Sequence, residues 1–180
     1  MNIIKKYFKL WAGVLYCYTA YSFAVDVPIN ISGTVKAPPC VINNNEKIIF
    51  NFKTVQIDKV NNYDNSITKD IAIDCQYYQG KPYINVVGDK LAGAPNNVLG
   101  TKGNTGLGIS LYQGGAVNNT YPLVIGNNIN SLGNEIINGL SGKGQANGFF
   151  SITAVPYALN SSNLKPGRFE STAKIVITYN

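Results

Sequence analysis

The sequence contains no histidine, and residues suited to acid–base chemistry are sparse. Histidine is the commonest general base and metal ligand, so its absence removes most catalytic and metal-binding designs. The 9 acidic residues are scattered, and Asp70 and Asp74, on one predicted strand face, stand too far apart for a catalytic pair. The glycine runs at 100–108 and 139–148 lack the Gly-Lys-Ser/Thr ending of a P-loop. We therefore expect no enzymatic activity, no metal and no cofactor.

Dense positive charge is also missing once the first 24 residues are set aside. Three lysines lie within residues 1–9, a mostly apolar run follows at 10–21, and Ser22-Phe23-Ala24 supplies small residues for cleavage. This order is typical of a secretory signal peptide at 1–24. The apolar run is shorter than the ~20 residues that a membrane-spanning helix needs. Removal of the whole signal peptide lowers the formal charge from +6 to +3. No Lys/Arg cluster is left that would predict nucleic-acid binding.

Cysteine is scarce, and only two of the 3 cysteines lie beyond the predicted signal peptide. Cys40 and Cys75 would therefore enter an oxidising compartment together, which predicts one disulfide bond, with two free thiols as the alternative. On the chain-entropy account, closing a loop of this size stabilises the fold by about 4 kcal/mol.

What the exported chain does contain is Gly, Asn, Val, Ile and Tyr, a composition that indicates an all-β protein with many turns. Alternating segments predict strands at 47–52, 67–75, 83–87, 107–111, 121–125 and 148–158. The last of these is apolar on both faces, as a central strand is. Residues 91–106 and 127–147 are predicted connections. Short strands with one disulfide indicate an immunoglobulin-type sandwich, although its usual buried tryptophan is missing.

Residues 167–180 follow the strongest period-two pattern of the chain. One face holds Phe169, Ala173, Ile175, Ile177 and Tyr179. The opposite face is polar except for Val176, so the pattern predicts a strand with one buried face. Because the sequence shows no hairpin after this strand, its far edge needs a cover. A long uncovered apolar edge is an aggregation hazard, and either an earlier strand or another chain would cover it.

Residues 25–37 show a second period-two pattern. One parity holds Val25, Val27, Ile29, Ile31, Gly33, Val35 and Ala37. Pro28 lacks an N–H and confines the segment to one-sided pairing, and Gly33 is a weak point in an ordinary strand. By itself the pattern fits two structures equally, a first strand of the sandwich or an arm that pairs with another molecule.

In combination, these motifs resemble the pilin (fimbrial subunit) family of the chaperone–usher pathway of Gram-negative bacteria. The resemblance covers nearly the whole exported chain. It rests on 31–35 followed by Pro38-Pro39-Cys40, on the strand ending at Cys75, on 106–111, and on Gly167 and Tyr179, fourteenth and second from the end. The residues around Cys40 are more similar to minor subunits than to the rod subunit. One departure is Asn51-Phe52-Lys53, where many relatives have an acidic–Phe–Gly run, and we expect it to reshape a turn.

The resemblance implies an incomplete immunoglobulin-like β-sandwich at 38–180 that lacks its last strand, preceded by a donor-strand extension at 25–37. The C-terminal strand would border an open groove. A strand of a periplasmic chaperone would fill this groove first, and the extension of a neighbouring subunit would replace it at an outer-membrane usher. The acceptor residues would be Gly167, Phe169, Ala173, Ile175, Ile177, Tyr179 and Asn180. The donor residues would be Val27, Ile29, Ile31, Gly33 and Val35, with Gly33 at the tightest point.

The function that the resemblance implies is structural. We expect a minor or adaptor subunit of an adhesive pilus, exported through the periplasm to the fimbrium at the cell surface. Contact with a host receptor would be indirect, through the fibre tip. A protein of another class is the alternative, namely a self-contained secreted β-sandwich that binds carbohydrate or a host receptor. The 12 tyrosines could line a sugar-binding surface, although packing is their commoner use.

Overall fold

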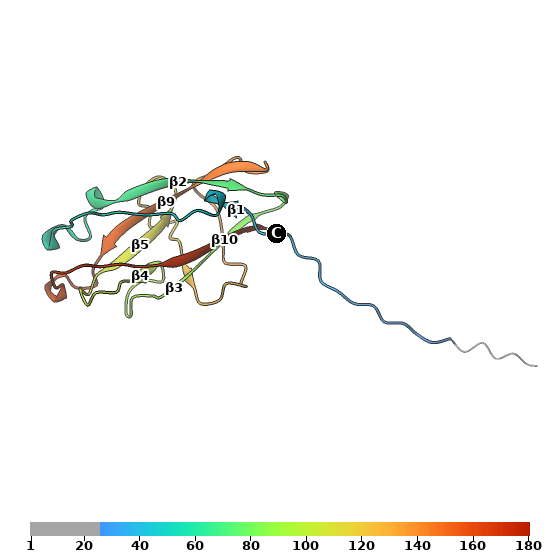
Figure 1. Cartoon of the computed structure of the whole chain (residues 1–180), viewed down its shortest axis with the longest axis horizontal. Helices are drawn as coiled ribbons and strands as arrows, with labels where there is room; N and C mark the ends of the chain where they lie inside the picture. Colours follow the sequence, from blue (N-terminus) through green and yellow to red (C-terminus); the bar gives the residue numbers. More distant parts are fainter. Residues whose placement is uncertain (1–25) are drawn as a thin grey trace, which may run out of the picture. The chain divides into compact units, whose positions relative to one another are not determined.

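Residues 36–180 fold into two β-sheets packed face to face, as Figure 1 shows. The structure is a computed structural model that describes residues 26–180; the predicted signal peptide and Val25 lie outside the described residues. The N-terminal segment 26–35 is a separate unit. Across 26–180 the only helices are single 3-10 turns, at Asn43–Asn45, Ile57–Lys59, Tyr63–Asn65 and Ser161–Asn163. None of these described helices is long and apolar enough to cross a membrane.

The larger sheet has six strands in the order β1-β2-β9-β5-β4, with β8 pairing beside β9. Their bounds are β1 Val41–Ile42, β2 Ile67–Asp74, β4 Val98–Gly100, β5 Gly108–Gln113, β8 Leu140–Ser141 and β9 Asn147–Tyr157. All pairs are antiparallel. β9 lies between β2 and β5, which confirms the prediction that the segment apolar on both faces is a central strand.

The smaller sheet has four strands in the order β10-β3-β6, with β7 also pairing with β3. Their bounds are β3 Pro82–Gly88, β6 Ile125–Gly126, β7 Asn134–Glu135 and β10 Ala173–Tyr179. β10 runs antiparallel to β3 along its whole length, from Ala173 opposite Gly88 to Tyr179 opposite Pro82. The prediction of an all-β sandwich that lacks a strand is confirmed, because no strand of the described chain pairs with the other edge of β10.

The core lies between the two sheets and takes alternate side chains from each. Ile71 and Phe150 enter it from the larger sheet, and Ile84 and Ile177 enter it from the smaller one, all at most 2% exposed. Burying a side chain of this size contributes roughly 1.5–3 kcal/mol. Because every second residue of a strand points inward, the period-two patterns of the sequence translate directly into this core.

The structure corrects several of the predicted segments, and the strand predicted at 167–180 extends only over Ala173–Tyr179. Residues 47–52 alternate between half-buried and exposed side chains, but they pair with no other described segment and so form no strand. The predicted connection 91–106 contains β4, whose Val98 is fully buried. Of the predicted strand 121–125, only Ile125 belongs to a strand, together with Gly126. In each case the side-chain pattern does not show whether another segment pairs with the backbone, and this pairing decided the outcome.

The predicted loop 127–147 contains β7 and β8, and two buried amides anchor it. Asn85 on β3 donates through Nδ2 to three backbone carbonyl oxygens in 128–131, at 2.8 to 3.1 Å. Gln113 on β5 accepts at Oε1 from the backbone N–H groups of Ile137 and Asn138, at 3.0 and 3.3 Å. Since an unpaired buried amide is costly, these bonds hold the connection against the sandwich.

Candidate functional site

β10 is an edge strand with one bare side. β3 satisfies one edge, and the other receives a single backbone hydrogen bond within the described chain, from Cys40 N to Ile177 O at 2.8 Å. In an antiparallel ladder, alternate residues direct their N–H and C=O groups to the same side, so Ala173 and Ile175 share the direction of Ile177. Their backbone groups therefore face an open edge, which is a template for pairing with another strand.

The segment 46–57 lies opposite this edge as the second wall and is itself unpaired. Its inward side chains, Ile48, Phe50 and Phe52, pack against the core and are half-buried, whereas Ile49 on the other parity is 65% exposed. On the β10 side, Ile175 also packs against the core and is only half-buried. Apolar groups from both walls are therefore incompletely covered.

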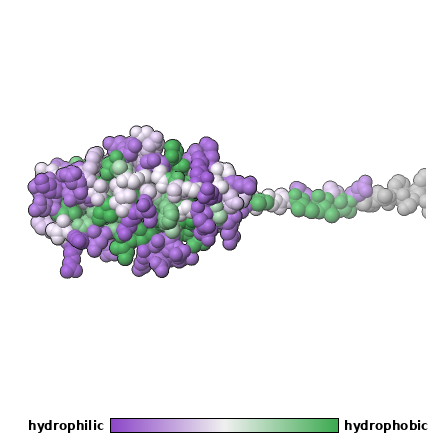
Figure 2. All heavy atoms as spheres, turned by 90° about the horizontal axis from the view of Figure 1, so that it is seen from above, coloured by the Kyte–Doolittle hydropathy of each residue, from purple (hydrophilic) through white to green (hydrophobic). Residues whose placement is uncertain are grey.

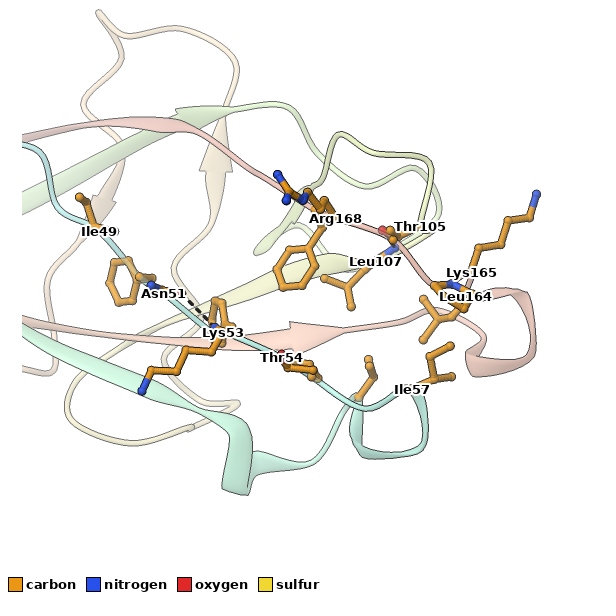
Figure 3. A pocket seen from close by; sticks show the side chains of 17 residues that line it. Ile49, Asn51, Lys53, Thr54, Ile57, Thr105, Leu107, Leu164, Lys165 and Arg168 are labelled. Carbon is orange, nitrogen blue, oxygen red and sulfur yellow. Dashed lines mark hydrogen bonds between the residues drawn. The ribbon is translucent and has the colours of Figure 1, made fainter.

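A cleft of about 500 Å³ opens between this segment and the residues that lead into β10, as Figure 3 shows. Its apolar lining consists of Ile49, Phe50, Phe52, Val55, Ile57, Val60, Leu107, Leu164, Pro166 and Phe169. The rings of Phe52 and Phe169, one from each wall, have centroids 6.3 Å apart, within the range of a favourable aromatic pair. The cleft thus has room for aliphatic side chains against the apolar part of its lining.

Backbone contacts with 102–105 hold the wall at 164–169 in place. Lys165 N donates to Thr105 O at 3.0 Å, and Lys102 N donates to Glu170 O at 2.8 Å. Gly103 has a φ of +106° and faces the carbonyl of Arg168 so closely that a Cβ would collide with it. Only glycine allows this approach, and the approach fixes the position of the cleft wall.

The turn on the opposite wall has an unusual backbone. Lys53 has a φ of +53°, a left-handed conformation that costs a non-glycine residue roughly 1–2 kcal/mol. The backbone N–H of Lys53 donates to Oδ1 of Asn51 at 2.9 Å, which stabilises the turn (Figure 3). A lysine therefore occupies a glycine-like conformation at the mouth of the cleft.

The predicted acceptor residues fall into two groups. Gly167 and Phe169 line the cleft, and the residues from Ala173 to Tyr179 belong to β10. Burial along the inward face of β10 decreases toward the cleft, because Tyr179 and Ile177 are buried, Ile175 is half-buried and Ala173 is exposed. The expectation that this whole face is buried is therefore wrong at Ala173.

At the far end of β10, Asn180 and Lys81 exchange two backbone hydrogen bonds of 2.9 Å. Asn180 is exposed, and burial raises the pKa of the Tyr179 phenol beside it. The ends of the strand thus differ. The Tyr179 end is closed, and the Ala173 end is open toward the cleft.

Sequence reasoning did not identify the wall at 46–57, or Leu107 and Leu164 in the cleft. The alternation at 47–52 is the available signal, but it predicts a strand that the structure does not form. An alternating segment forms a strand only where another segment pairs with its backbone, and no local sequence pattern shows whether such a partner exists.

The described N-terminal residues form no strand. Val27, Ile29, Ile31 and Val35 are 75, 82, 89 and 100% exposed, and a Cβ on Gly33 would meet nothing within 4 Å. Hydrophobic residues, green in Figure 2, make up much of the surface of this segment. The alternative in which 25–37 is a first strand of its own sandwich therefore finds no support in residues 26–37. A regular row of exposed apolar side chains is typical of a segment that binds a partner.

A disulfide joins Cys40 to Cys75, which confirms the predicted pairing. It ties the residue before β1 to the residue after β2, beside the backbone hydrogen bond from Cys40 to β10. The bond therefore fixes the place where the N-terminal segment enters the sandwich.

A second hollow, of about 410 Å³, lies on the larger sheet and has an uncharged lining that includes Tyr63, Tyr112 and Tyr157. Within 26–180, no three His, Cys, Asp or Glu side chains gather as they would to hold a metal ion.

Comparison with known proteins gives consistent results. A sequence model of the family described as fimbrial protein matches residues 29–180. The fimbrial adapter PapF of Escherichia coli is 38% identical over 162 residues, which is 90% of this chain and 93% of PapF. The minor fimbrial protein PrsF of the same species is 37% identical over the same shares.

Solved structures agree. A structure of the P pilus adaptor subunit PapF covers 82% of this chain and all of that chain, with 33% identity and a TM-score of 0.54. A subunit in the structure of a chaperone–usher pilus has a TM-score of 0.57 at 18% identity, covers 89% of this chain and 100% of that one, and supports the fold alone.

Proposed function

Because this chain belongs to the fimbrial protein family, we propose that it is a structural subunit of a surface pilus and that it polymerises by strand donation. The observation that carries the proposal is the bare edge of β10, together with the cleft that opens between the unpaired segment 46–57 and the residues that lead into β10. An immunoglobulin-like sandwich needs one more strand at this place. The exposed apolar row at 26–35, which forms no strand in the described chain, would supply the strand that a neighbouring copy of the fold lacks.

The physical mechanism is β-augmentation, in which an extended segment adds a strand to an exposed sheet edge. Backbone groups of Ala173 and Ile175 would pair with the incoming strand, and its alternate side chains would enter the gap between β10 and 46–57. Gly167, Phe169, Ala173, Ile175, Ile177, Tyr179 and Asn180 would form the acceptor side. Val27, Ile29, Ile31, Gly33 and Val35 would form the donor side, and Gly33 would pass the point where no side chain fits.

The curated relatives favour a minor or adaptor position in the fibre, since one is an adapter and the other a minor fimbrial protein. We divide the chain into a signal peptide at 1–24, a donor extension at 25–37 and a pilin domain at 38–180. Its partners would be a periplasmic chaperone, an outer-membrane usher and neighbouring subunits, along a route through the periplasm to the cell surface. The role is structural, and no catalysis is part of it.

Deletion of residues 25–34 from the exported chain separates donation from acceptance. The shortened chain should still be recovered from the periplasm in complex with a chaperone, and it should still accept a strand from a neighbour. It should no longer enter the groove of another subunit. Loss of solubility and of chaperone binding, in addition to loss of donation, would show that this segment is part of the core.

A matched pair of point variants sharpens the test. Gly33→Leu should abolish donation, because its side chain would meet the floor of the groove. Ser32→Leu adds the same side chain one residue away, on the opposite face of the strand, and should leave donation nearly intact. Subunit complexes that survive on non-boiled gels give the readout. Equal donation by both variants would contradict the assignment of Gly33.

A further inference from the structure

The mouth of the cleft carries charge of one sign. Lys53, Lys165 and Arg168 line it, and no acidic residue does. All three are exposed, and Figure 3 shows the charged ends of Lys53 and Lys165 pointing away from the cleft centre. The nearest acids along the chain lie outside the lining, and each adjoins a lysine. Asp58 precedes Lys59, and Glu170 is bridged through its backbone to Lys102.

The backbone conformation of Lys53 is a second, independent observation on this positive charge. This residue keeps a φ of +53°, where glycine would cost less, and the turn is supported by one hydrogen bond, which the backbone N–H of Lys53 donates to Oδ1 of Asn51. The sequence therefore tolerates a strained backbone that presents a cation at the cleft mouth. Strained positions cluster at binding sites, where the strain serves recognition.

The direction of an incoming strand decides which of its residues meets these cations. β10 runs from the cleft toward Tyr179 and is antiparallel to β3. A strand that continues this antiparallel order pairs more stably than a parallel one, and its carboxyl end then lies at the cleft. For the donor segment of a second copy of this chain, Val35 would lie at the cleft and Lys36 beside the three cations.

We infer that the cleft selects a donor strand with an acidic residue beside the side chain that fills the cleft, and that it disfavours a second copy of this chain. The inference rests on the proposed function and names the partner chemistry of the same site. Exposed charges at the rim of an interface act mainly on the association rate and its salt dependence. Such a subunit would accept a different neighbour more readily than its own kind, and would thus join unlike subunits.

Synthetic peptides of residues 26–37 test this directly. The wild-type peptide carries Asp26 and Lys36, one charge of each sign. A Lys36→Glu peptide places a carboxylate at the cleft end. All peptides are amidated at the carboxyl end, so the control peptide, Lys36→Gln with Asn30→Asp, has the same net charge as the Lys36→Glu peptide, but its carboxylates lie far from the cleft. Each peptide carries fluorescein at its amino end, because the chain from 26 to 180 has no tryptophan to report binding.

Association with the exported chain, refolded with its disulfide intact, is followed by fluorescence anisotropy. At low salt the Lys36→Glu peptide should associate roughly fivefold faster than the control peptide, as expected for a few exposed charge pairs. The wild-type peptide should be the slowest. In about 0.5 M salt the three rates should converge, because exposed charges are then screened.

Variants of the acceptor complete the experiment. Lys165→Gln with Arg168→Gln should abolish the preference for the acidic peptide, whereas Lys143→Gln, at an exposed loop outside the cleft, should preserve it. Lys53→Gly should reduce the preference and, by relieving the backbone, raise the resistance of the chain to urea.

Equal rates for the Lys36→Glu and control peptides, with binding intact, would overturn charge selection and leave strand donation in place. Failure of every peptide to bind at any salt concentration would overturn the proposed function as well.

Discussion

Two isoleucines on the same face of β10 give the sharpest test of the missing strand. Ile177 is fully buried, whereas Ile175, two residues closer to the cleft, is only half-buried. If a donor strand completes the sandwich, Ile175 becomes buried on binding, and Ile177 has no exposed area left to bury. We therefore predict that truncation at the two positions affects different equilibria.

The magnitudes follow from burial. Ile177→Ala should lower the free energy of unfolding of the chain alone by about 2–5 kcal/mol, the usual cost of such a cavity. Ile175→Ala should cost roughly half as much, because part of its side chain already contacts water. When the donor peptide binds, Ile175→Ala should lose a further ~1.4 kcal/mol, which raises the Kd of the peptide about tenfold. Ile177→Ala should leave that Kd nearly unchanged.

The assay combines urea denaturation of each variant with titration of the labelled 26–37 peptide. If Ile177→Ala proves too unstable to titrate, Ile175→Val and Ile177→Val give the same contrast at smaller cost, about 0.5–1.5 kcal/mol for a buried site. Equal changes in Kd at both positions, or no change at Ile175, would contradict an acceptor groove along this edge.

Three further results are expected. Cys40 and Cys75 should resist thiol reagents in the non-reduced chain, and labelling of either would be incompatible with the disulfide. Burial raises the pKa of the Tyr179 phenol above its ordinary 10.0, so this phenol ionises at lower pH in the unfolded chain than in the folded one. The free energy of unfolding should therefore fall as the pH rises above 10.0. Tyr179→Phe should reduce this fall in a series of urea midpoints measured at alkaline pH. Gly103→Ala should destabilise the cleft wall by about 1–3 kcal/mol, whereas Gly115→Ala, where a Cβ meets nothing within 4 Å, should have little effect on the urea midpoint.

The sequence by itself determined the fold class, most strands and the ends of the candidate site. Strands β2, β3 and β9 lie within two residues of their predicted bounds, because alternation along a strand is a local property. The disulfide followed from the count of exported cysteines. The resemblance of the terminal motifs to pilins predicts that Gly167 and Phe169 belong to an acceptor site, and in the structure both residues line the cleft.

Only the tertiary structure decided which edges are paired. Residues 47–52 have the pattern of a strand and no partner, whereas Val98, inside a predicted connection, lies on a paired strand. The departure at Asn51-Phe52-Lys53 predicts a reshaped turn, but the left-handed backbone of Lys53 and the close approach of Gly103 to Arg168 appear only in the tertiary structure. The physical reason is that a ladder needs a second strand from elsewhere in the chain. Side-chain alternation reports which face of a segment is buried, but it carries no information about whether the backbone edge beside it is occupied.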